Sequence, residues 1–261
     1  MLSGPGIPAE LKKEFDNFVI EKEQEKSREL IELSYQQDKF FSIIAHDLRS
    51  PFNSLLGFSE VLVADLKELD PEEIEKIVLY LNKSANNIFQ LLNNLLDWSR
   101  IRIGRTEVNL QMVALNEIVV KILNLYQEPA KLKGITLKNK IFDDLIIKYD
   151  QNMLETIIRN LIGNAVKYCR EDDIIVVSAD QISEKLVQIS VADSGICMSE
   201  EILSGLFQID SDVKRAGTND EPSTGLGLLL CKEFVELHGG KIWAISLKDK
   251  GSIFYLTIPI A

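Results

Sequence analysis

A long segment almost free of helix breakers is the feature that most constrains this chain. Residues 9–65 contain one proline, Pro51, and one glycine, Gly57. From Phe41 onward the apolar residues recur at spacings built from three and four, which places them on one face of a helix. The sequence therefore predicts a long helix here. It also predicts a kink at Pro51, whose ring lacks an N–H and clashes with the carbonyl group of residue 47.

A second helical segment follows a helix-start signal. Asp70 suits the N-cap, Pro71 the first helical position and Glu73 the third position of a capping box. The apolar residues then alternate in steps of three and four, as in coiled coils. This stripe is formed by Ile74, Ile77 or Val78, Leu81, Ala85, Ile88, Leu92 and Leu95. The short turn predicts an antiparallel hairpin. Since one hairpin covers its own stripes poorly, we expect a homodimer with a four-helix bundle.

The pattern changes after Gly104, where short β-like runs alternate with helical ones. The β-like runs are residues 106–112, 135–141, 145–149, 174–181, 186–192, 241–247 and 252–258, and the helical runs are 115–133, 151–169 and 225–238. Mixed elements of this kind predict a two-layer α/β sandwich. The predicted fold is therefore multidomain, an all-α hairpin followed by an α/β sandwich, with the boundary near residues 101–106.

Charge and composition exclude several classes of protein. Lys plus Arg number 29 against 40 Asp plus Glu, and this net charge of -11 argues against nucleic-acid binding. We find no apolar run long enough to cross a bilayer and expect no membrane contact by this chain. The three cysteines form no CxxC pair, which argues against a disulfide framework or a zinc site. A reducing, cytoplasmic location is expected.

The first candidate for chemistry is His46 with its neighbour Asp47. His46 lies two residues from both Ile44 and Leu48 and so points away from their stripe. An exposed imidazole can act as a nucleophile through one nitrogen, provided that a partner on the other nitrogen fixes its tautomer. Asp47 is the local candidate for that partner. A lone surface histidine on a coiled coil would show the same pattern.

The second candidate is a polar helix face in the segment 151–169. Asn160, Asn164 and Lys167 are spaced i, i+4 and i+7 and share one face, beside a largely apolar face that includes Tyr168. Amide oxygens suit a hard cation such as Mg²⁺, and a lysine suits phosphate. An ordinary amphipathic helix with a solvated face remains the alternative.

Two glycine-containing turns complete the candidates. Asp193 ends a predicted strand and is followed by Ser194 and Gly195, and such an acid can accept a hydrogen bond from an exocyclic amine like that of adenine. Gly225 and Gly227 flank Leu226 at the start of an apolar helix, where glycines let backbone N–H groups approach a phosphate. Each pattern alone is also what a plain turn looks like. Neither a P-loop nor a Rossmann fingerprint is present.

Taken in order, these motifs resemble those of a bacterial two-component sensor histidine kinase. The matching stretches are 46–51 (H box), 160–168 (N box), 193–195 (first glycine box), Phe207 (F box), 225–227 (second glycine box) and 251–254 (a final glycine-containing strand motif). The resemblance covers residues from about 38 to 261. Before that stretch, over residues 1–38, the composition indicates a loop or cloning scar at residues 1–8 and a helical signalling linker from residue 9 onward. A dimerisation and histidine-phosphotransfer hairpin over 39–103 and a Bergerat-type ATP-binding domain over 104–261 would follow.

The resemblance also implies roles for residues. His46 would take the γ-phosphate of ATP, Asp47 would orient and activate it, and Ser50 would help to place a water that dephosphorylates the partner. The phosphate would pass to an Asp of a response-regulator receiver domain. Asn164 would bind Mg²⁺, and residues 198–222 would form a mobile ATP lid. The residues implied to bind the nucleotide are Asn160, Asn164, Lys167, Tyr168, Asp193, Gly195, Gly225, Leu226 and Gly227.

Two departures from the family pattern stand out. Cys197 occupies a position that is usually glycine in the first glycine box, where a side chain would crowd the nucleotide or stiffen the lid hinge. Position 47 is Asp where many members have Glu, and the carboxylate is retained. Two alternatives are a degenerate module that binds ATP or only dimerises, and another Bergerat ATPase. The H-box hairpin argues against the second. His238, in a family turn, is expected to be structural.

Overall fold

The computed structural model describes residues 9–102, 107–208, 217–218 and 226–259. The chain divides into two compact units, residues 1–46 and 47–261, and the division falls inside the first helix. Helix α1 spans Ala9–Asp65 without interruption, so the predicted linker and the first hairpin helix form one element that continues through Pro51. The domain boundaries expected from the sequence and the kink at Pro51 stay predictions.

Helix α2 spans Pro71–Arg102 and begins with the capping box that the sequence predicts. The Asp70 backbone N–H donates to Glu73 Oε2 at 3.0 Å, and the Glu73 backbone N–H donates to Asp70 Oδ1 at 2.8 Å. Two N–H groups that lack intrahelical partners are thus satisfied by neighbouring side chains. The short-range prediction is confirmed.

The buried face of α2 differs from the predicted stripe at two positions. Ser84 and Leu91 are buried, together with Ile77 and Ile88. The stripe predicted from the sequence used Ala85 and Leu92 instead, and both of these are exposed. Each alternative keeps coiled-coil spacing, so the periodicity could not choose between two adjacent apolar stripes. The stripe that includes Ala85 and Leu92 remains exposed within one copy of the chain.

The C-terminal part contains a five-stranded sheet with the order β2-β4-β5-β7-β6. Its strands are β2 (Thr136–Asn139), β4 (Ile174–Ser183), β5 (Leu186–Asp193), β6 (Ile242–Leu247) and β7 (Gly251–Pro259). The pair β2–β4 is parallel and the other pairs are antiparallel. A separate two-stranded sheet joins β1 (Gln111–Ala114) to β3 (Ile146–Tyr149). The strand expected over residues 106–112 thus corresponds to β1, which begins later in the sequence, at Gln111.

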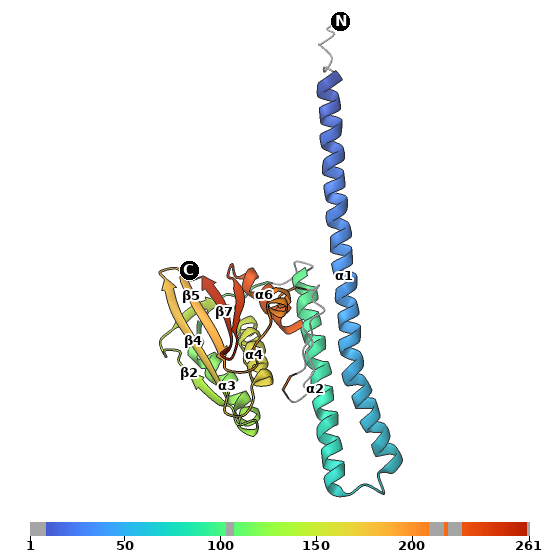
Figure 1. The fold of residues 1–261 in the computed structure, drawn as a ribbon, viewed down its shortest axis with the longest axis vertical. Coiled ribbons are helices and arrows are strands. Elements are labelled where there is room, and N and C mark those ends of the chain that lie inside the picture. The colour runs from blue at the N-terminus through green and yellow to red at the C-terminus, as the bar shows by residue number, and fades with distance from the viewer. Residues whose placement is uncertain (1–8, 103–106, 209–216, 219–225, 260–261) are drawn as a thin grey trace. The chain divides into compact units, whose positions relative to one another are not determined.

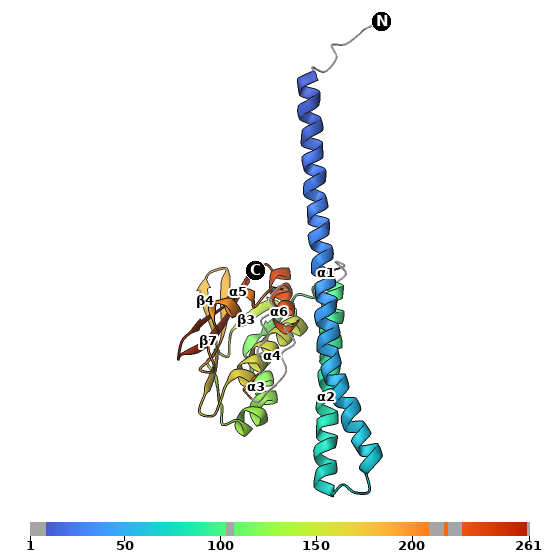
Figure 2. The ribbon, with the colours of Figure 1, turned by 45° about the vertical axis from the view of Figure 1, so that its right-hand side comes forward.

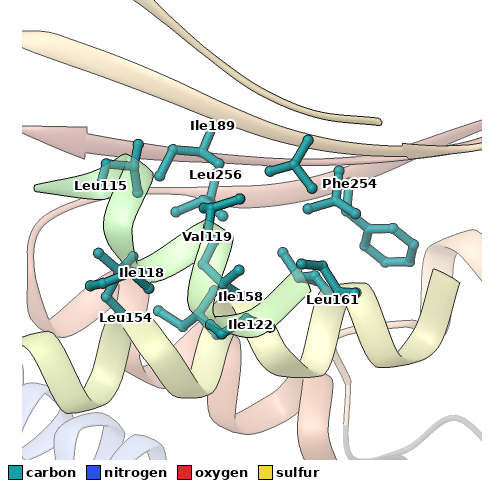
Figure 3. Close-up of a cluster of buried hydrophobic side chains, with 14 of the residues drawn as sticks. Leu115, Ile118, Val119, Ile122, Leu154, Ile158, Leu161, Ile189, Phe254 and Leu256 are labelled. Atoms are coloured by element: carbon teal, nitrogen blue, oxygen red, sulfur yellow. The ribbon is translucent and has the colours of Figure 1, made fainter. Parts of the chain in front are cut away.

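Helices α3 (Leu115–Leu132), α4 (Gln151–Tyr168) and α6 (Leu226–Leu237) lie on one face of the large sheet (Figures 1 and 2). Every second residue of β5 is buried, which is the alternation of a strand with one covered face. Side chains from α3 and α4 meet those of the strands in one apolar cluster that includes Ile158, Ile189 and Leu256 (Figure 3). The two-layer α/β sandwich is confirmed.

One short helix was not expected. Helix α5 (Glu200–Gly205) lies in the segment predicted to be a lid loop, and the Ser199 hydroxyl caps it by accepting from the Ile202 N–H at 3.3 Å. Six residues are too few for a helical period to stand out in the sequence. In the part of the chain that the structure describes, no helix is both long and apolar enough to cross a membrane.

Candidate functional site

The C-terminal half of α4 carries the predicted polar face. The helix is started by Asp150, whose carboxylate accepts from the backbone N–H groups of Asn152 and Met153. Its apolar side, which includes Leu161 and Ala165, is buried in the core. Burial of that side fixes the rotation of the helix. Its polar residues Asn160, Asn164 and Lys167 are therefore half-buried at the edge of the core.

Asn164 differs from Asn160 in its hydrogen bonding. The Asn160 amide donates to the Thr156 carbonyl at 3.0 Å. The Asn164 side chain takes part in no hydrogen bond with any other described residue. The polar atoms of this amide are not among the described buried atoms that lack a partner, so they are accessible to solvent and to a ligand. Its oxygen is the kind of atom that a hard cation prefers. The metal-binding role expected of Asn164 stays a prediction.

Gly163 has a role that the sequence analysis missed. A Cβ on this residue would lie 2.6 Å from the hydroxyl oxygen of Tyr126 on α3. Glycine therefore lets α3 and α4 pack closely and keeps the N-box helix in place. A glycine in mid-helix costs about 1 kcal/mol relative to alanine, and that cost is the signal that could have pointed to a close contact.

The second glycine motif lies against the N-box face. A Cβ on Gly227, in the first turn of α6, would lie 2.8 Å from Asn160 Oδ1. Leu226 is 4% exposed, so its side chain belongs to the core and only its backbone can face a ligand. Gly225 lies outside the described residues. The structure thus brings Asn160 and Gly227 together as the resemblance implies.

The first glycine motif meets the end of α4. The Ile196 N–H donates to the Tyr168 carbonyl at 3.1 Å. A Cβ on Gly195 would lie 2.5 Å from the same carbonyl oxygen, which excludes any larger residue at this position without a backbone shift. Three predicted motifs therefore converge on one helix.

Asp193 is a buried carboxyl at the end of β5. Burial raises its pKa to about 6, and the backbone N–H groups of Gly195 and Ser252 offset part of that rise. The nearby Asp173 carboxylate raises the pKa further. The Gly195 N–H donates to Asp193 Oδ1 at 3.0 Å. An ionisable group held at this cost in a strand end is a functional-site signal.

Lys167 and Tyr168 form the end of the polar face. The Lys167 ammonium lies 5.2 Å from the centre of the Tyr168 ring, within cation–π range. The Lys167 carbonyl accepts from the backbone N–H of Thr218 at 3.0 Å. Gly217 and Thr218 were expected in a flexible loop, and the structure instead fastens Thr218 to α4. Phe207, the F-box residue, is half-buried and packs against the core.

The unusual Cys197 turns its sulfur toward the β6–β7 turn. Its thiol donates to the Leu247 carbonyl at 3.0 Å. Backbone N–H groups, that of Gly251 first, lower the pKa of this thiol. The contact links the start of the 198–222 segment to the sheet. Crowding of the nucleotide and a stiffer hinge, the two effects expected from a side chain here, both stay predictions.

His46, Asp47 and Ser50 all lie on α1. His46 and Ser50 are exposed, and Asp47 is 7% exposed. Ser50 follows His46 by one helical turn, so both side chains lie on one side of α1. The exposure of His46 confirms that it points away from the apolar stripe, where Ile44 is buried.

His238, the second histidine, is held on all sides. Its ring stacks on Tyr149 at a centroid distance of 3.6 Å. Nδ1 lies 2.7 Å from the Phe234 carbonyl, and Nε2 accepts from the Asp150 N–H at 3.3 Å. With both nitrogens occupied this way the ring is neutral, with its proton on Nδ1, and burial lowers its pKa. These contacts support the structural role expected from the sequence.

Two family matches cover most of the chain. Residues 36–104 match the His Kinase A (phospho-acceptor) domain. Residues 149–261 match the histidine kinase-, DNA gyrase B- and HSP90-like ATPase domain. Among curated proteins, a sensor-like histidine kinase of Rhizobium meliloti is 30% identical over 85% of this chain and 42% of its own length. The adaptive-response sensory kinase SasA of Rippkaea orientalis is 31% identical over 84% of this chain and 57% of its own length.

A solved structure agrees in fold. The histidine kinase ThkA in complex with the response regulator protein TrrA has a TM-score of 0.65 and 24% identity, over 92% of this chain and 66% of that one. The chain spans from about a quarter to somewhat less than half of the length of the first relatives, so it corresponds to one part of each of them. The phospho-acceptor and ATPase matches, in the order that the H, N and glycine boxes follow, show that the chain belongs to the two-component sensor histidine kinases and contains their catalytic core.

Proposed function

We propose that this chain catalyses ATP-dependent phosphorylation of its own His46 and passes the phosphoryl group to an Asp of a response-regulator receiver domain. The observation that carries the proposal is the convergence of Asp193, the glycine turns and the polar face of α4. Phosphoryl transfer needs mainly positioning and charge stabilisation, and this cluster offers both.

ATP fits the cluster group by group. The Asp193 carboxylate accepts a hydrogen bond from the exocyclic amine of adenine, and the Gly195 N–H helps to hold that carboxylate in place. The backbone at Gly227, in the first turn of α6, offers an N–H group where a helix favours anions, and Gly225 is assigned to the phosphates by its motif alone. Lys167 and Tyr168 contact the phosphates. Asn164 holds Mg²⁺, which when bound neutralises charge on the phosphate oxygens.

His46 acts as the nucleophile. One ring nitrogen bonds to the γ-phosphorus while the bond from that phosphorus to the ADP oxygen breaks. The other nitrogen gives its proton to a base, and Asp47 is the acceptor that we assign. The two residues lie about 100° apart around α1, with His46 exposed and Asp47 buried. Asp47 therefore does not occupy the exposed face of α1 on which His46 receives the phosphate.

Purified protein with labelled ATP and Mg²⁺ tests the kinase assignment. It should gain an acid-labile, base-stable phosphate, and His46→Gln should abolish this label while nucleotide binding survives. Undiminished label in that variant would reject His46 as the acceptor.

A second pair of variants tests the nucleotide site. Asn164→Ala should lose Mg²⁺-dependent ATP binding and keep its melting temperature, because its amide supports no described contact. Asn152→Ala is the matched control, since Asn152 is an exposed asparagine at the other end of α4. A marked loss of melting temperature in Asn164→Ala alone would indicate a structural role instead.

Ser50 is proposed to help reverse the signal by placing a water at the phosphorylated regulator. A hydroxyl can donate to and accept from that water. Ser50→Ala should slow dephosphorylation of a phosphorylated regulator and leave phosphorylation of His46 largely intact. Ser42→Ala is the control, because Ser42 is exposed one turn before His46 as Ser50 is one turn after it. Equal dephosphorylation by Ser50→Ala and wild type would remove this role.

A further inference from the structure

The carboxyl end of α4 is held by three segments that are far apart in the sequence. The last carbonyls of a helix have no intrahelical partner and must be satisfied from elsewhere. The Ile196 N–H serves the Tyr168 carbonyl at 3.1 Å. The carbonyls of Val166, Lys167 and Cys169 are served by Lys133 and Thr218.

Lys133 approaches from the end of α3. Its ammonium lies 3.1 Å from the Val166 carbonyl, 3.4 Å from the Lys167 carbonyl and 3.1 Å from the Thr218 hydroxyl. An ammonium carries three N–H donors, and the two carbonyls and the hydroxyl can each accept from it. A positive charge at this place also complements the negative end of the α4 dipole. Lys133 is half-buried, so its side chain is held rather than freely solvated.

Thr218 approaches from the 198–222 segment. Its backbone N–H donates to the Lys167 carbonyl at 3.0 Å. Its hydroxyl lies 3.0 Å from the same carbonyl and 2.8 Å from that of Cys169, and it accepts from Lys133. The Lys133 ammonium and the Thr218 hydroxyl therefore share the Lys167 carbonyl and contact each other. The loss of either group changes the contacts of the other.

We propose that Lys133 and Thr218 are positioning residues of the ATP site, which together hold the carboxyl end of α4 and thereby fix Lys167 and Tyr168. The inference rests on the proposed function for its catalytic consequence. Both residues act through the helix end, because their contacts are with the backbone carbonyls of Val166, Lys167 and Cys169, which include and flank the residues that carry the phosphate-binding side chains. Lys133, at the end of α3, and Thr218 thus support the phosphate-binding end of α4.

Three variants and their controls test the inference. Lys133→Met keeps the aliphatic stem and removes the ammonium, and Thr218→Val keeps the shape and removes the hydroxyl. Thr218→Ser keeps the hydroxyl and serves as the rescue. Lys131→Met is the matched control, since Lys131 is an exposed lysine in the last turn of α3.

The first measurement needs no kinase activity. The Thr218 amide should be protected from hydrogen exchange in the wild type, because it donates to the Lys167 carbonyl. Lys133→Met should speed its exchange several-fold and Lys131→Met should not. Unchanged exchange in Lys133→Met would overturn the contact on which the inference depends.

The second measurement is the rate of autophosphorylation across ATP concentrations. Thr218→Val and Lys133→Met should each lower kcat/KM roughly tenfold, the effect of one lost hydrogen bond to a charged or buried group. Their double variant should lose little more than either single one, since both act through the same carbonyl. Thr218→Ser should recover most of the rate.

The outcomes separate the two proposals. An inactive wild type with a protected Thr218 amide would contradict the proposed function and leave the structural contact intact. An active wild type with unchanged kcat/KM in Thr218→Val would overturn the positioning role. Fully additive losses, or an equal loss in Lys131→Met, would also overturn it. If Lys133→Met fails to fold, the isosteric Thr218→Val still decides.

Discussion

Replacing Asp193 by Asn should stabilise the fold in a pH-dependent way. The substitution keeps the size of the side chain and an oxygen that can accept from the Gly195 N–H, whose distance to Oδ1 is now 3.0 Å. It removes the ionisable group that burial makes costly to charge. The carboxyl is held there at the expense of stability, as expected for a group kept for binding rather than folding.

The magnitude follows from the pKa. Raising the pKa of Asp193 from 3.8 to about 6 costs the folded state about 3 kcal/mol once the carboxyl is ionised in both states. Because the folded pKa is the higher one, this carboxyl's favourable contribution is present below pH 3.8 and lost as the pH rises through about 6. The Asn variant has no such dependence.

Chemical denaturation of the full chain at pH values from about 4 to 8 measures the effect. The stability of Asp193→Asn relative to wild type should rise by about 2 kcal/mol across this range, because the unfolded carboxyl is already partly ionised at pH 4. If the Asn side chain makes a weaker hydrogen bond, the variant loses the same stability at every pH. The pH dependence of the difference in stability between variant and wild type is then unchanged. Asp180→Asn, at an exposed carboxylate on the adjacent strand β4, is the control for the change from Asp to Asn itself.

A difference between Asp193→Asn and wild type that stays flat from pH 4 to 8 would refute this reasoning. So would a variant that loses relative stability as the pH rises. In the same samples ATP binding should weaken about tenfold in the variant, because a bond to a charged acceptor becomes a neutral one. Full affinity in the variant would contradict the adenine-binding role of Asp193.

Three further outcomes follow from the structure. Burial lowers the pKa of His238 below its usual 6.5, so the contribution of the neutral ring to stability is complete above pH 6.5 and is lost on acidification. In thermal melts, His238→Gln should reduce this loss between pH 7 and 5. Gly195→Ala should cost about 1–3 kcal/mol and weaken ATP binding, since its Cβ would lie 2.5 Å from the Tyr168 carbonyl; an unchanged melting temperature would contradict this. Light scattering should give about twice 29.5 kDa for wild type and a monomer for Leu92→Glu, whose side chain is 42% exposed in one copy; a monomeric wild type would contradict the dimer.

Local interactions explain why much of the chain could be predicted from the sequence. The capping box of Asp70 and Glu73 spans three residues, so its geometry is contained in the sequence. The polar face of Asn160, Asn164 and Lys167 follows from the helical period alone. The order of the boxes identified the family because each motif is short and contiguous.

Tertiary structure decided what depends on distant partners. The periodicity of α2 allowed two neighbouring stripes, and packing selected Ser84 and Leu91 rather than Ala85 and Leu92. The pairing of β1 with β3 as a separate sheet depends on contacts between strands, which no single run of residues encodes.

The site shows the same division. The sequence named Asp193 as an adenine acceptor, but only its burial against the strand ends produces the raised pKa. Lys133 and Thr218 lie 85 residues apart, and neither has a sequence pattern that points to the other. Their pairing exists because the end of α4 leaves backbone carbonyls that the surrounding segments must satisfy, and that demand arises only once the helices and the sheet have packed.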